Sequence, residues 1–164
     1  MMSTDKNLAA AFAGESQANR KYLAFAKQAD QEGLPQIAKL FRATAEAETI
    51  HAHAHFKAMG GIKSTAENLK AALSGETYEF EEMYPPFIKT AEADNNAAAV
   101  RTFKLANEAE KVHAELYKKA LANLASKEVY DVFLCPVCGH VAEGSVPDAC
   151  PICGAKAAAY KKID

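Results

Sequence analysis

The stretch EAETIHA at residues 46–52 recurs 62 residues later as EAEKVHA at residues 108–114. Five of the seven positions are identical, and a sixth pairs isoleucine with valine. Each copy contains a glutamate followed three residues later by a histidine, and residues three apart lie on one face of an α-helix. The repeat therefore predicts two helices that each present a Glu-x-x-His pair, which is able to bind one metal ion.

The sequence around this repeat is rich in alanine and predicts four long helical segments. We place them at about residues 5–32, 35–60, 64–94 and 97–125. Ser64 with Glu67 three residues later resembles a capping box, which opens a helix. Pro85-Pro86 should kink or interrupt the third segment, because proline removes a backbone donor and clashes with the preceding turn.

The repeat extends beyond the heptapeptide. GES at residues 14–16 is echoed by GET at 75–77, and FAK at 25–27 is echoed by FIK at 87–89. This pattern predicts two helix hairpins related by a pseudo-twofold axis. The expected fold is an all-α four-helix bundle, up-down with a long crossover after the second helix.

Di-iron carboxylate bundles need a Glu-x-x-His pair from each of two helices and a single glutamate from each of the other two. The two single glutamates occupy matching positions of the repeat. The full predicted ligand set is Glu15, Glu48, His51, Glu76, Glu110 and His113. Carboxylate oxygens can bridge and neutralise two irons, and each imidazole adds one neutral donor. Two irons together can deliver two electrons, which suits the reduction of an O–O bond.

All four cysteines fall near the C-terminus, in CPVCG at residues 135–139 and CPICG at residues 150–154. Disulfide frameworks of secreted proteins spread their cysteines across the domain, so this clustering favours a metal site in a reducing compartment. The four predicted ligands are Cys135, Cys138, Cys150 and Cys153. A tetrahedral thiolate site suits zinc as well as iron, and the neighbouring di-iron pattern favours iron. The helical period is lost before this segment, which predicts a bundle domain at 1–130 and a small metal-knuckle domain at 131–164.

The charge and hydropathy pattern exclude two classes of partner. The net charge is -2, and no basic run is long enough to bind nucleic acid. No signal peptide is indicated, and no stretch is long and apolar enough to span a membrane. We therefore expect a cytoplasmic protein.

The motifs resemble those of the rubrerythrins over nearly the whole chain, and the cysteine segment resembles a rubredoxin with a shortened middle. The resemblance rests on GESQA at 14–18, ETIH at 48–51, GETYEFEEMYP at 75–85 and EKVH at 110–113. It implies a ferritin-like bundle in which Glu79 is an extra carboxylate that one iron exchanges for His51 between oxidation states. It also matches Tyr22 and Tyr84 to family tyrosines near the ligands.

The resemblance further implies a peroxidase of oxidative-stress defence that reduces hydrogen peroxide to water. The iron held by the four cysteines would relay electrons that come from NAD(P)H through a separate reductase or a rubredoxin, since the chain shows no dinucleotide fingerprint. It also implies a homodimer in which the cysteine domain of one subunit approaches the di-iron site of the other.

Two other interpretations remain open at this point. One is a ferroxidase, an oxygen scavenger or an iron-storage protein, as in other ferritin-like bundles, although the cysteine domain argues against storage. The other is a binding module without catalytic activity, stabilised by zinc in the cysteine knuckles.

Overall fold

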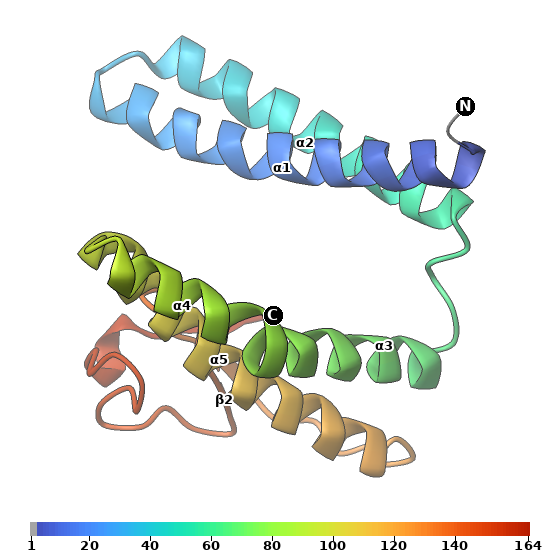
Figure 1. Ribbon diagram of the computed structural model, residues 1–164, viewed down its shortest axis with the longest axis vertical. Coiled ribbons are helices and arrows are strands. Elements are labelled where there is room, and N and C mark those ends of the chain that lie inside the picture. Colours follow the sequence, from blue (N-terminus) through green and yellow to red (C-terminus); the bar gives the residue numbers. More distant parts are fainter. Residues whose placement is uncertain (1–2) are drawn as a thin grey trace. The chain divides into compact units, whose positions relative to one another are not determined.

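The computed structural model describes residues 3–164, which divide into two compact units, one ending at Lys63 and the other spanning Ser64–Asp164. Each unit is built on a hairpin of long helical segments, and the second unit also carries the cysteine domain (Figure 1). The prediction of four long helical segments followed by a small cysteine-bearing domain is confirmed. None of the helices in residues 3–164 combines the length and apolar composition that crossing a bilayer requires.

The first unit consists of α1 (Thr4–Gln31) and α2 (Pro35–Ala58), which pack along their length (Figure 1). Gly33 has a φ of +72°, which allows the tight reversal between them, and Pro35 begins α2 where no backbone donor is needed. The buried residues of the two helices are all small: Ala26, Ala29, Ala38, Ala45 and Ala52. Alanines at the seam let the two backbones approach closely, so that glutamates on both helices can reach one site.

The helices of the second unit are α3 (Thr65–Tyr78), the π-helical turn η1 (Glu79–Met83), α4 (Tyr84–Ala93) and α5 (Ala97–Ala122). The predicted capping box at the start of α3 is present, because Ser64 and Glu67 each accept the other's backbone N–H. Both α3 and α4 pack against α5. The third predicted segment is therefore one continuous run of helix interrupted by η1.

The π-helical turn lies where the two prolines were expected to disturb the helix. Pro85 and Pro86 have no N–H to donate to the carbonyls four residues earlier, and the Tyr84 N–H donates instead to the Glu79 carbonyl, five residues earlier. This turn also explains an irregularity of the repeat: Gly75 follows Gly14 by 61 residues, whereas Phe87 follows Phe25 by 62. The second hairpin thus contains one additional residue, accommodated by η1.

The cysteine domain contains a three-stranded antiparallel sheet with the strand order β2-β1-β3. Its strands are β1 (Val132–Leu134), β2 (Val141–Glu143) and β3 (Lys161–Ile163), and a short 3₁₀ helix, η2 (Ala157–Ala159), precedes β3. Its buried residues are Cys135, Cys150 and His140. Because a core this small rarely stabilises a domain alone, we expect its fold to depend on a metal bound by the cysteines.

Candidate metal centres

The four cysteines converge at one point of the small domain. Their sulfur atoms all lie within 4.8 Å of one another, with 3.6 Å between the Sγ atoms of Cys135 and Cys153 and 3.5 Å between those of Cys138 and Cys150. Tetrahedral metal–thiolate bonds of about 2.3 Å place sulfur atoms about 3.8 Å apart. The four thiols are free and fit a single tetrahedral metal ion.

The two knuckles share the same backbone geometry. Gly139 N–H donates to the Cys135 carbonyl at 3.0 Å, and Gly154 N–H donates to the Cys150 carbonyl at 2.9 Å. Both glycines have a positive φ, +86° and +74°, which only glycine adopts without strain. Each glycine therefore closes the tight turn of its knuckle.

Hydrogen bonds also reach the sulfur atoms. Burial alone would raise the pKa of the Cys150 thiol, but hydrogen bonds from the Tyr160 hydroxyl and from the backbone N–H groups of Cys153 and Ile152 lower it to about 6. The same hydroxyl lies 2.8 Å from Nδ1 of His140, which is buried. The domain thus stabilises a thiolate at Cys150, the form that binds metal.

In the first unit, Glu15 on α1 and Glu48 and His51 on α2 form a cluster of three metal-ligand side chains. Nδ1 of His51 lies 2.9 Å from Glu48 Oε2 and 4.0 Å from Glu15 Oε1. The predicted Glu-x-x-His pair therefore faces the single glutamate of the neighbouring helix. We call this cluster the first half-site.

The second unit repeats the arrangement with Glu76 on α3 and Glu110 and His113 on α5, which we call the second half-site. Nδ1 of His113 lies 2.7 Å from Glu110 Oε2 and 3.5 Å from Glu76 Oε2. Each half-site thus joins a Glu-x-x-His pair to the single glutamate of the neighbouring helix within one unit. The union of the two around one pair of irons stays a prediction.

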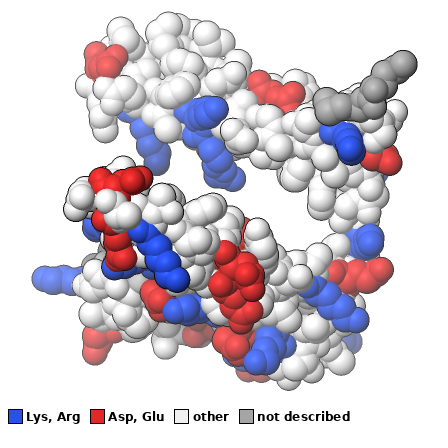
Figure 2. Space-filling model, viewed as in Figure 1, with Lys and Arg blue, Asp and Glu red and all other residues white. Residues whose placement is uncertain are grey.

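The second half-site carries more negative charge than a metal-free protein tolerates easily. Burial, a hydrogen bond with Glu76 and the charge of Glu76 raise the pKa of Glu110 to about 7. Burial and the charge of Glu76 also raise the pKa of Glu79, one turn further along. A bound cation would relieve this repulsion, so the donor set fits iron. Figure 2 shows acidic side chains gathered over the junction of α3 and α4, where η1 carries Glu79, Glu81 and Glu82.

The ring of His113 is oriented for metal binding by the cysteine domain. Its Nε2 lies 2.9 Å from the carbonyl oxygen of Gly139, which can only accept a hydrogen bond. Nε2 therefore carries the proton, and Nδ1 is left as the donor atom that faces the carboxylates. Metal-binding histidines are usually fixed in this way by a carbonyl or carboxylate.

The two predicted tyrosines occupy equivalent places in the two hairpins. Tyr22 packs against Phe25 and Phe41, with ring centroids 6.3 Å away in each case. Tyr84 packs in the same way against Phe87 and Phe103, at 6.4 and 6.1 Å. Burial and the charges of Glu110, Glu79 and Glu76 raise the pKa of Tyr84, so its hydroxyl lies in the field of the second half-site.

Several functional contacts were not predicted from the sequence. Tyr160 and His140 support the cysteine site, and the Gly139 carbonyl contacts a predicted iron ligand. These contacts join residues far apart in the chain. The only sequence feature that pointed to these contacts was the position of Tyr160 near the second knuckle. That position alone does not indicate which residues Tyr160 contacts.

Comparison with known proteins identifies both parts of the chain. The rubrerythrin family profile matches residues 6–121, and the profile of the rubrerythrin rubredoxin-like domain matches residues 133–161. Nigerythrin of Nitratidesulfovibrio vulgaris Hildenborough is 40% identical over 165 residues, covering 92% of this chain and 82% of that protein. Rubrerythrin-2 of Clostridium acetobutylicum is 36% identical over 166 residues, covering 91% of this chain and 90% of that protein.

A solved structure agrees with the sequence relatives. Fully reduced, all-ferrous nigerythrin matches with a TM-score of 0.62 at 37% identity, covering 99% of this chain and 88% of that chain. The half-sites and the four-cysteine site supply the ligands that such a protein requires. The chain therefore belongs to the rubrerythrin family, whose metal centres are a carboxylate-bridged di-iron site and an iron bound by four cysteines.

Proposed function

We propose that this protein is a peroxidase that reduces hydrogen peroxide to water, with electrons relayed through the four-cysteine iron. Rubrerythrins are oxidoreductases. The overall change consumes one peroxide, two electrons and two protons and yields two water molecules. The electrons would come from NAD(P)H through a separate reductase or a rubredoxin.

The ligands for the iron pair would be the two half-sites together with Glu79. When bound, the iron pair supplies the two electrons that cleave the O–O bond. The chain's own contribution is to hold five carboxylates and two imidazoles in position. In the second half-site, His113 keeps its Nδ1 directed at Glu110 because Gly139 fixes the opposite ring nitrogen.

Glu79 distinguishes the two half-sites. Its position one turn after Glu76 has no acidic counterpart in the first hairpin, where the residue three after Glu15 is Ala18. We infer that Glu79 serves as the exchangeable ligand that replaces His51 on one iron as the oxidation state changes. Burial and the charge of Glu76 raise the pKa of this carboxyl group.

The observation that carries the proposal is the contact between His113 and Gly139. Gly139 follows Cys138, one of the four cysteine ligands, and its carbonyl lies 2.9 Å from the ring of a predicted iron ligand. A one-electron carrier placed this close to a two-electron centre supports a relay rather than iron storage.

The proposal is tested by mixing fully reduced protein anaerobically with hydrogen peroxide, and separately with dioxygen, in a stopped-flow spectrometer. We expect peroxide to oxidise both metal centres faster than dioxygen does, seen as the return of the visible absorbance of the ferric four-cysteine site. Faster oxidation by dioxygen would overturn the peroxidase assignment and favour oxygen scavenging. A colourless protein with zinc in that site would show that the four-cysteine site does not relay electrons.

Substituting Glu79 with alanine should leave both irons bound but slow peroxide turnover by about 10- to 100-fold, as removal of a group that tunes a metal site usually does. The matched control is Glu82→Ala, which removes an exposed carboxylate from the same turn. Iron content and turnover are measured on both variants. Equal turnover in Glu79→Ala and the control would refute the ligand-exchange role.

A further inference from the structure

The four-cysteine site has a ligand that accepts a hydrogen bond from a tyrosine hydroxyl group. The Tyr160 hydroxyl bonds to the sulfur of Cys150 and also lies 2.8 Å from Nδ1 of His140. We propose that Tyr160, oriented by His140, is a positioning residue that acts through Cys150 to raise the reduction potential of the four-cysteine iron. This inference goes beyond the proposed function, because it concerns the preference of one centre for the ferrous state and holds for any oxidant.

The small sheet brings these two side chains together at the start of the first knuckle. His140 directly precedes β2 and Tyr160 directly precedes β3, and these two strands flank β1 on its two sides. Leu134, the last residue of β1, pairs with Val141 on one side and with Lys161 on the other. The strand order β2-β1-β3 therefore places residues 140 and 160 at the same end of the sheet.

The ring of His140 is held firmly in this position. His140 is only 8% exposed, and its backbone carbonyl accepts a hydrogen bond from the N–H of Cys135 at 2.8 Å. Its ring meets that of Tyr160 edge to face, with centroids 5.9 Å apart and an interplanar angle of 88°. An imidazole and a phenol packed in this way have little rotational freedom, so the position of the hydroxyl group is defined.

Metal binding determines which atom donates in each of the two contacts of the hydroxyl. A metal-bound thiolate has no proton and can only accept a hydrogen bond, so the hydroxyl proton of Tyr160 points to Cys150. The tyrosine oxygen is then left to accept a hydrogen bond from Nδ1–H of His140. His140 thus uses its ring proton to hold the hydroxyl in the orientation that donates to the sulfur.

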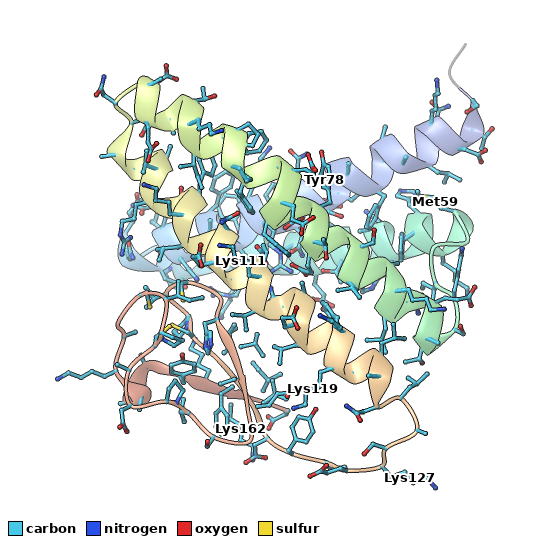
Figure 3. All side chains as sticks on the ribbon, turned by 60° about the horizontal axis from the view of Figure 1, so that its bottom comes forward. Met59, Tyr78, Lys111, Lys119, Lys127 and Lys162 are labelled. Atoms are coloured by element: carbon cyan, nitrogen blue, oxygen red, sulfur yellow. The ribbon has the colours of Figure 1, made fainter. Side chains whose placement is uncertain are left out.

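Tyr160 also distinguishes the two knuckles, whose backbone hydrogen bonds to sulfur are otherwise alike. The backbone N–H of His140 bonds to the Cys138 sulfur in the first knuckle. The equivalent N–H of Ala155 bonds to the Cys153 sulfur in the second. The sulfur atoms of the domain lie together in Figure 3, where they are drawn in yellow. Because the hydroxyl comes from a side chain, a single substitution removes it without changing either turn.

The direction of the effect follows from the charge at the sulfur atoms. When the site accepts one electron from the external reductase or rubredoxin, ferric iron becomes ferrous and no atom is transferred. The thiolates then carry more negative charge, so a hydrogen bond donated to one of them becomes stronger. The hydroxyl therefore stabilises the ferrous state more than the ferric state, which raises the reduction potential.

An anaerobic redox titration of the iron-loaded protein measures this preference through the visible absorbance of the ferric four-cysteine site. Tyr160→Phe keeps the ring and removes the hydroxyl. At a fixed potential its ratio of ferrous to ferric iron should fall by about three- to tenfold, which lowers the midpoint potential by about 30 to 60 mV. The matched control is Tyr130→Phe, whose lost hydroxyl bonds to Glu143 rather than to a sulfur, and its potential should be unchanged. An unchanged or higher potential in Tyr160→Phe would overturn the inference.

The same titration tests the orienting role of His140. His140→Leu removes the N–H that holds the hydroxyl, whereas His140→Asn keeps a side-chain N–H near the position of Nδ1. We expect a lowered potential in His140→Leu, with a smaller change than in Tyr160→Phe, and a potential close to that of the wild type in His140→Asn. Equal potentials in His140→Leu and the wild type would overturn the orienting role.

A measurement on the wild-type protein tests the hydrogen bond itself. Cadmium, like zinc, binds four thiolates tetrahedrally, and the ¹¹³Cd nucleus couples to a proton across a hydrogen bond to a bound sulfur. In the NMR spectrum of the cadmium-loaded protein we expect this coupling at the Tyr160 hydroxyl proton, as at the amide protons of Cys153 and Ile152. A hydroxyl proton that lacks the coupling, or exchanges with solvent too fast to be observed, would overturn the inference. Neither the titration nor this spectrum involves peroxide, so the result is separable from failure of the proposed function.

Discussion

Replacing Cys135 with alanine should abolish steady-state reduction of peroxide by an external donor while leaving the helices folded. Cys135 is fully buried and supplies one of four thiolates to a domain whose sheet has three strands of three residues each. Metal binding contributes on the order of 10 kcal/mol to folding in small domains of this kind. Losing one thiolate should therefore unfold residues 131–164 and remove the relay.

The helices should survive because α1 to α5 lie outside that segment. Helical circular dichroism should be nearly unchanged, while the amide signals of residues 131–164 collapse to unfolded positions in the NMR spectrum. Chemically reduced protein should still be oxidised by peroxide once, because the iron pair remains. The control is Val137→Ala, at a half-exposed position in the same knuckle. Wild-type turnover in Cys135→Ala would show that electrons bypass this site.

Zinc separates the folding role of the cysteine site from its redox role. Wild-type protein loaded with zinc there should regain the fold of residues 131–164, because zinc accepts the same tetrahedral thiolates. It should nevertheless fail to turn over with an external donor, since zinc has no redox chemistry. Turnover by the zinc form would exclude the electron relay, even if residues 131–164 are folded.

The two Glu-x-x-His pairs could be found in the sequence because their spacing follows a local rule. Glu48 and His51 are three residues apart on one helix, and each Glu-x-x-His pair faces the single glutamate of the neighbouring helix. The same holds for the capping box at Ser64 and for the two knuckles, which are turns of fixed composition. Local spacing determines these features, so one sequence was sufficient to find them.

Other features depend on contacts that spacing does not encode. The prolines at 85 and 86 predicted an interruption, but a kink and a π-helical turn give the same signal in sequence. The docking of the cysteine domain on α5 depends on the path of the linker and on pairs such as Lys119 with Glu143, 24 residues apart. Neither Lys119 nor Glu143 belongs to a recognisable motif. The contact between the Gly139 carbonyl and the His113 ring likewise could not have been predicted without coordinates.

Substituting Glu110 with glutamine should have opposite effects on the metal-free and metal-bound protein. Burial and the hydrogen bond and charge of Glu76 raise the pKa of Glu110 to about 7, against an ordinary value of 4.5. The folded protein therefore binds this proton more tightly than the unfolded chain does. With iron removed from the half-sites, the stability of the wild type should fall as pH rises from about 4.5 to beyond 7.

Glutamine keeps the shape of the side chain but removes this titration. A shift of this size corresponds to about 3 kcal/mol, and screening by solvent at a partly exposed site reduces it to about 1 to 2 kcal/mol. With iron removed from the half-sites, Glu110→Gln should therefore be more stable than the wild type by that amount at pH 8. It should show little difference at pH 4.5, where the wild-type carboxyl is already protonated. Urea unfolding at the two pH values measures both effects.

Iron binding should change in the other direction, because the variant loses an anionic ligand that lies 2.7 Å from the Nδ1 donor of His113. Iron content after dialysis should fall well below that of the wild type. The matched control is Glu108→Gln on the same helix, where the carboxylate is exposed and pairs with Lys111. If Glu110→Gln instead destabilises the iron-free protein at pH 8, the carboxylates do not repel one another. The crowding of negative charge that makes the second half-site a place for iron would then be absent.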